Sequence, residues 1–204
     1  MDLNPDLSGI PLPWPAKGDE LFGVDGNPHL QATISLRTDL IGHIEGYKRA
    51  GDLIFAEFHR SPRLLATGYL VFPGVYLYRH FVELSIKDII ALGNYLENDP
   101  SSYPAEHDLD ALWSLARGLI ERLGPGCTED DLDAMTRLIA QLNAIDPGNA
   151  FRYPMTRDQR PSLSTLPTFN LEQFKSGIEK MSGFFDGARS MLGEYKSTKD
   201  SIGW

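Results

Sequence analysis

Residues 76–92 read YLYRHFVELSIKDIIAL, and this stretch decides the fold. At about 100° per residue along a helix, its main polar and ionisable side chains fall within a sector of roughly 100°. These side chains are Tyr76, Arg79, His80, Glu83 and Lys87. Most of the remaining circumference is apolar, and a helix that is apolar on most sides is normally covered by neighbouring helices. The pattern predicts the central helix of a bundle.

The charges on this helix are then carried into a core. We call Arg79, Glu83 and Lys87 the central row, because they follow one another at intervals of four residues. Buried charges are strongly destabilising unless they are paired and hydrogen-bonded. The central row is therefore either a structural network or a functional site.

Composition narrows the class of protein. The chain has 204 residues, a formal net charge of −9, 42% hydrophobic residues and 23% charged residues, which is typical of a globular domain. The negative charge argues against a broad nucleic-acid surface, which needs clustered lysine and arginine. No apolar run approaches the ~20 residues that cross a bilayer. With one cysteine, Cys127, and no apolar signal core, we expect a cytoplasmic protein that does not contact a membrane.

The rest of the chain predicts an all-α fold. Residues 1–30 contain five prolines and predict an extended arm, and residues 31–145 predict an antiparallel bundle of four to five helices. Residues 146–169 predict an irregular loop, and residues 170–204 a C-terminal helix. The apolar stripe of this helix is narrow, which fits packing on the bundle or on a second protomer, so a homodimer is expected. Within this last segment, residues 196–204 are expected to be loose apart from Trp204.

Local signals mark where the helices begin and end. Asp108, Thr128 and Asn170 each stand before an apolar periodic segment, as N-cap residues do. Gly124 follows the segment that begins after Asp108 and predicts its end.

Two motifs resemble the HEPN family (higher eukaryotes and prokaryotes nucleotide-binding domains). In that family, a helix that begins with aromatic residues carries a Glu-x-x-Leu-Lys motif. After a loop, the sequence His-Asp-Leu opens the next helix. The matching residues here are Tyr78, Glu83, Ile86, Lys87 and Ile90, followed by His107, Asp108, Leu109, Leu112 and Trp113. The resemblance covers roughly residues 37 to 145, with the segment FRYP at 151–154 and the last helix as an extension. It implies a helical bundle, often dimeric, from antiphage-defence or toxin–antitoxin systems.

Many HEPN members are metal-independent ribonucleases that use an arginine followed shortly by a histidine on a helix after the His-Asp-Leu turn. No histidine follows His107 in this chain, so that motif is missing. A ribonuclease site would instead use His80 and His107 as the acid–base pair, with Arg79 and Lys87 stabilising the developing phosphorane charge.

A structural interpretation of the same residues is simpler. Glu83 pairs with another member of the central row one turn away, Arg152 reaches in from the loop, and His107 or Asp108 holds the next helix. We favour this interpretation, because ion-pair networks perturb titratable groups without doing chemistry.

The expected function is therefore binding, as a HEPN-like regulatory or partner-recognition component. The candidate binding residues are the central row with Asp108, Arg152 and Tyr153. A nucleotide sensor is a further alternative, with Arg79, Lys87 and Arg152 facing phosphates. The FRYP segment could also stack on an RNA base, although aromatic residues around an arginine more often seal a core edge.

Neither a metal nor another cofactor is expected. The five histidines are scattered along the sequence and do not form clusters at ligand spacing. The sequence also lacks a glycine-rich phosphate loop and a serine elbow.

Overall fold

The computed structural model describes residues 15–22, 26–32, 40–60, 68–124, 126–148 and 150–202. The chain divides into two compact units, Met1–Leu36 and Arg37–Trp204. Within its described residues, the first unit contains one short 3-10 helix, η1 (Pro28–Leu30). The Asn27 side chain caps it by accepting a hydrogen bond from the His29 amide at 3.0 Å.

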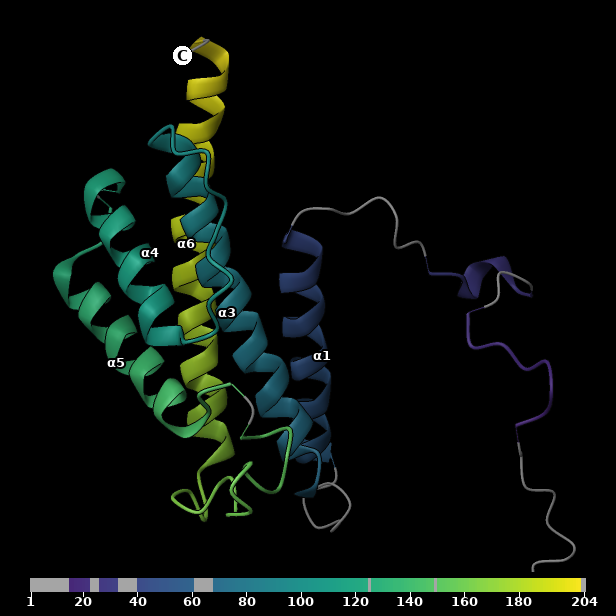
Figure 1. Ribbon diagram of the computed structural model, residues 1–204. Helices are drawn as coiled ribbons and strands as arrows, with labels where there is room; N and C mark the ends of the chain where they lie inside the picture. The colour runs from purple at the N-terminus through teal and green to yellow at the C-terminus, as the bar shows by residue number, and fades with distance from the viewer. Residues whose placement is uncertain are drawn as a thin grey trace, which may run out of the picture. The chain divides into compact units, whose positions relative to one another are not determined.

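The second unit is helical, as the sequence predicts. Its described residues form five α-helices: α1 (Ile41–Arg60), α3 (Val71–Leu96), α4 (Leu109–Leu123), α5 (Glu129–Ile145) and α6 (Leu171–Ile202) (Figure 1). Outside them, a single antiparallel bridge between Met155 and Pro161 is the one strand-like pairing in the described part of the chain. None of the described helices has the length and apolar character of a bilayer span. The predicted all-α class is confirmed.

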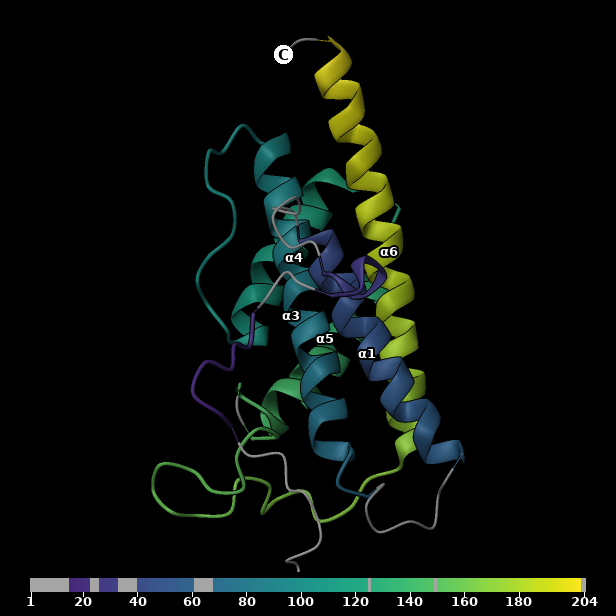
Figure 2. The same ribbon diagram turned by 90° about the vertical axis from the view of Figure 1, so that its right-hand side faces the viewer.

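The helices alternate in direction with one exception. Figures 1 and 2 show that α3 and α4 run the same way, because residues 97–108 carry the chain back along α3 before α4 begins. This return segment places the start of α4 beside the middle of α3. It therefore brings the His-Asp-Leu turn next to the central row.

The helix α3 is the centre of the unit, as predicted. It packs against α1, α4 and α6, and most of its residues are buried. It is longer than the stretch that predicts it and begins at Val71. Pro73 is tolerated in its first turn because the missing amide would have no helical partner there. On α4, Trp113 is 2% exposed and its indole Nε1 donates to Thr136 Oγ1 of α5 at 2.8 Å. The buried indole is therefore also hydrogen-bonded.

The predicted helix ends are confirmed. The Asp108 side chain accepts from the Ala111 amide at the start of α4, and Gly124 is its C-cap. Thr128 and Asp131 form a reciprocal capping box on α5. Asn170 accepts from the Gln173 amide at the start of α6.

The last helix packs on its own bundle and extends further than expected. The buried stripe of α6, which includes Met181, Phe185 and Leu192, lies in the same core as α3. The expectation of a loose end at 196–202 is wrong, because α6 continues to Ile202 and Lys199 is held there. Its Nζ donates to the carbonyls of Tyr95 and Leu96 at 2.7 and 3.1 Å, and so caps the C-terminus of α3. Residues 203–204 lie outside the described residues.

Candidate functional site

The central row is buried and lies along one line of α3. The side chains of Arg79 and Glu83 are each 3% exposed, and that of Lys87 is 6% exposed. The spacing of four residues places each side chain about one turn from the next. The row therefore lies inside the bundle and does not face bulk water.

Glu83 is the charge that holds the row together. Its Oε2 accepts from Arg79 Nη1 at 2.8 Å, and its Oε1 accepts from Lys87 Nζ at 2.9 Å. The same Oε1 accepts from His107 Nδ1 at 2.8 Å. Burial alone would raise the pKa of Glu83, but the hydrogen bonds from its three partners outweigh burial and hold that pKa below its ordinary value. The carboxylate thus stays ionised.

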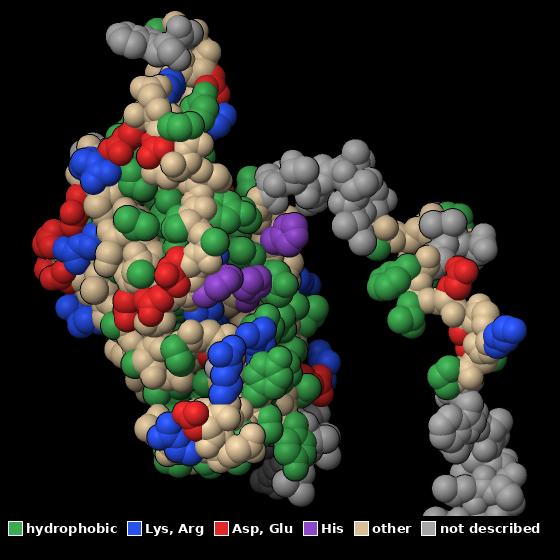
Figure 3. Space-filling view, viewed as in Figure 1, with side chains coloured by type: hydrophobic (Ala, Val, Ile, Leu, Met, Phe, Trp, Pro, Cys, Tyr) green, Lys and Arg blue, Asp and Glu red, His purple; other side chains and the backbone are tan. Residues whose placement is uncertain are grey.

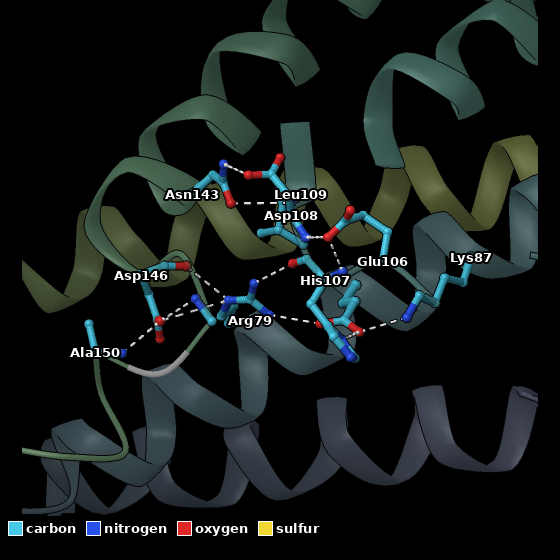
Figure 4. A network of polar contacts seen from close by, with 11 residues as sticks. Arg79, Lys87, Glu106, His107, Asp108, Leu109, Asn143, Asp146 and Ala150 are labelled. Carbon is cyan, nitrogen blue, oxygen red and sulfur yellow. Dashed lines mark hydrogen bonds and ion pairs between the residues drawn. The ribbon is translucent and has the colours of Figure 1, made fainter. Parts of the chain in front are cut away.

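Arg79 connects three parts of the chain. Besides Glu83, it donates from Nε to the carbonyl of Asp146 at 2.9 Å and from Nη2 to the carbonyl of His107 at 2.7 Å. Figure 4 shows the guanidinium between the end of α5 and the turn that opens α4. One side chain on α3 therefore holds both the residue that follows α5 and the turn that precedes α4.

Asn143 and Asp108 strengthen the same corner from α5 and α4. Asn143 Oδ1 accepts from the Leu109 amide at 3.1 Å. Its Nδ2 donates to Asp108 Oδ2 at 3.3 Å (Figure 4) and also to Asp110 Oδ2 at 2.8 Å. The predicted role of Asp108 in holding the next helix is found, and Asn143 is a partner that the motifs did not indicate.

Asp146 closes the network at the end of α5. It is completely buried, and its Oδ1 accepts from the amides of Gly148 and Ala150, each at 2.8 Å. The same Oδ1 lies 3.9 Å from Arg79 Nε, so it forms a long ion pair with the arginine. The sequence signal for this residue was only the Asp-Pro-Gly turn at 146–148.

His107 is the accessible member of the network. Its side chain is 71% exposed, although its Nδ1 is bound to the buried Glu83. A carboxylate that binds one ring nitrogen orients the imidazole and leaves the other nitrogen for a second partner. This orientation makes His107 the best placed of the two predicted acid–base residues.

His80 has a different environment. Its ring meets that of Tyr47 edge-on at 4.3 Å between centroids and stacks on Tyr76 at 6.1 Å. Burial lowers the pKa of His80. The negative charge of Glu83 opposes this shift, but the pKa of His80 remains below its ordinary value. His80 is therefore a neutral imidazole among tyrosines at pH 7.

Arg152 does not reach the central row, so that expectation is wrong. Its guanidinium lies over the ring of Tyr76 at 5.4 Å and over that of Tyr153 at 5.6 Å. Arg152 is exposed and Tyr153 is 57% exposed, so they do not seal a core edge either. The third partner of the Glu83 carboxylate is His107, not Arg152.

We call the connected rings and guanidinium the aromatic–arginine face. It consists of Tyr47, Tyr76, His80, Arg152 and Tyr153. Figure 3 shows histidine side chains gathered on one side of the helical unit, with lysine and arginine side chains beside them. Among the described residues, no three histidine, cysteine, aspartate or glutamate side chains form a group that could hold a metal ion.

Comparisons with known proteins found no relative. A scan against protein-family models gave no match, and searches of curated proteins and of solved structures gave none either. The resemblance to the HEPN family therefore depends on the sequence motifs alone.

Proposed function

We propose that this chain is a HEPN-like binding component of a bacterial antiphage-defence or toxin–antitoxin system, and that it recognises a partner rather than cleaving RNA. One observation carries the proposal: Glu83 binds Arg79, Lys87 and His107 inside the bundle. With Asp146 beside Arg79, the two buried cations are balanced by two buried carboxylates. Among the described residues, no buried cation is then left to stabilise a phosphorane or to meet the phosphates of a nucleotide.

The aromatic–arginine face is the surface best suited to a partner. Tyrosine and arginine are the residue types that dominate the energy of protein interfaces. They also stack on the bases of single-stranded RNA. Arg152 and Tyr153 are exposed, so a partner can reach them without any rearrangement of the core.

The first experiment separates binding from catalysis. Purified protein is incubated with total RNA in the presence of EDTA, and the RNA length distribution is followed over time. A binding component leaves the RNA intact, and a His107→Ala variant gives the same result. Cleavage by the wild type that disappears in His107→Ala would overturn the proposal.

A second experiment tests the face with a labelled single-stranded RNA. Arg152→Ala is compared with Arg160→Ala by fluorescence anisotropy, because Arg160 is exposed on the same loop but is paired with Asp158. Loss of binding in Arg152→Ala alone identifies RNA as the partner. Absence of binding by the wild type at micromolar concentration excludes this RNA as the partner of the face.

A metal-independent ribonuclease is the second candidate, and one observation favours it. His107 is held at Nδ1 by Glu83 and remains 71% exposed, which is the arrangement of an oriented general base. The proton donor for the leaving oxygen would be His80. The lowered pKa of His80 leaves little of its protonated form at pH 7, so the population of this proton donor would increase as the pH falls below neutrality.

A further inference from the structure

The second unit contains an apolar cavity that the binding proposal does not use. Its volume is about 340 Å³, and it lies between the start of α3, the end of α5, the first turns of α6 and the connecting loop. Aromatic and aliphatic side chains make most of its wall. Among them are Val75, Ile145, Phe151, Phe169, Phe174 and Ile178.

Gly177 leaves part of the cavity wall without a side chain. Gly177 borders the cavity from α6, and a Cβ built on it would meet nothing within 4 Å. Protein interiors are normally packed as densely as organic crystals, so an unfilled apolar space of this size is destabilising. A glycine in the middle of a helix adds a second cost, because alanine or leucine would favour the helix more.

The lining defines the chemistry of an occupant. Among the residues that the structure describes, no lysine, arginine, aspartate, glutamate or histidine lines the cavity. Its polar side chains are the amides of Gln141, Asn170 and Gln173, which are exposed and therefore form the rim. An ion buried here would lack a counter-charge, whereas an apolar body with one neutral hydrogen-bonding end would be satisfied at both ends. The volume lies within the ~300–1,000 Å³ range of small-molecule sites.

We propose that this cavity binds a small neutral apolar ligand, such as a medium-length alkyl chain or a fused aromatic ring with a hydroxyl or amide end. The apolar part lies between Phe151, Phe174 and the backbone at Gly177. The polar end lies among the rim amides. This inference is independent of the proposed partner recognition.

The test uses N-phenyl-1-naphthylamine, a neutral fluorophore whose emission rises in apolar sites. We expect saturable binding to one site on the full-length chain. Gly177→Leu should weaken that binding at least tenfold, because leucine extends into open space in the cavity. Gly187→Leu is the matched control: it lies on the same helix, is exposed, and its Cβ also meets nothing within 4 Å. Its dissociation constant should stay within twofold of the wild type.

Three further measurements separate loss of the cavity from loss of the fold and test the class of ligand. Circular dichroism should show that Gly177→Leu melts at or above the wild-type temperature, and Gly177→Ala, which fills less space, should weaken binding by a smaller factor in the same direction. Competition with decanol, decanoate and decyltrimethylammonium tests the ligand class, and decanol should displace the fluorophore at a concentration at least tenfold lower than either ion. The proposal is overturned if the wild type shows no saturable binding, if folded Gly177 variants bind as the wild type does, or if an ion competes better than decanol.

Discussion

Replacement of Glu83 by alanine is the most direct test of the buried network. In the described part of the chain, Glu83 is the only carboxylate in contact with both cations of the central row at less than 3 Å. In Glu83→Ala, Arg79 and Lys87 remain buried with their main counter-charge removed, and His107 loses the acceptor of its Nδ1. Leaving buried charges unpaired typically destabilises a protein by about 3–5 kcal/mol.

Arg79 and Lys87 differ in the partners that they keep when Glu83 is replaced by alanine. Arg79 keeps the carbonyls of His107 and Asp146 as acceptors, so part of its hydrogen bonding survives. Lys87 keeps only a contact with the ring of Tyr103, 5.7 Å from its Nζ, among its described partners. We therefore place the loss in the free energy of unfolding at about 3–4 kcal/mol, in the lower part of that range. For a chain of this size, the loss corresponds to a fall in melting temperature of roughly 6–16 °C.

Urea unfolding followed by circular dichroism measures this loss, and Glu57→Ala is the matched control. Glu57 is also a helical glutamate in an ion pair, but its partner Arg60 is 75% exposed. Removal of an exposed pair of this kind costs at most about 1 kcal/mol. A Glu83→Ala variant that loses no more than the Glu57→Ala control would refute the conclusion that the central row is a buried, mutually dependent network.

Three further predictions follow from the same structure. The pKa of His80 is lowered on folding, so the unfolded chain binds the proton more tightly. The free energy of unfolding should therefore be highest above about pH 6.5 and decrease as the pH falls below that value. In urea titrations, His80→Phe should make this decrease smaller. A Cβ at Gly93 would lie 2.9 Å from the Leu119 side chain, so Gly93→Ala should lower the free energy of unfolding by about 1–3 kcal/mol. A Cβ at Gly183 would meet nothing within 4 Å, so Gly183→Ala should raise the free energy of unfolding by about 0.5–1 kcal/mol in the same assay. Light scattering at micromolar concentration should give twice the mass of the chain, and a single-chain mass would contradict the expected homodimer.

The sequence predicted those features that depend on local rules. The buried character of α3 follows from its apolar circumference, and the pairing of Glu83 with Arg79 and Lys87 follows from their spacing of four residues. The caps at Asp108 and Thr128 follow from side chains that satisfy nearby amides. Each of these depends on residues within one or two turns of one another.

Long-range geometry was not predictable in the same way. Two of the acceptors around Arg79 are main-chain carbonyls, which every residue carries, so no residue type indicates them. Arg152 lies over the ring of Tyr76 and not beside Glu83. Both arrangements are compatible with the sequence FRYP, so the sequence does not distinguish between them. The cavity beside Gly177 likewise depends on how the connecting loop and α6 pack together.

The network also explains how α3 and α4 can run in the same direction. The return segment at 97–108 contains no regular helix, so it cannot by itself fix where α4 begins along α3. Arg79 holds the main chain of His107 and Glu83 holds its side chain, while Asn143 holds the amide of Leu109. These contacts set the register of the two helices. A loss of Glu83 should therefore displace the start of α4 as well as destabilise the core, and amide hydrogen exchange in the first turn of α4 should increase more than in its last turn.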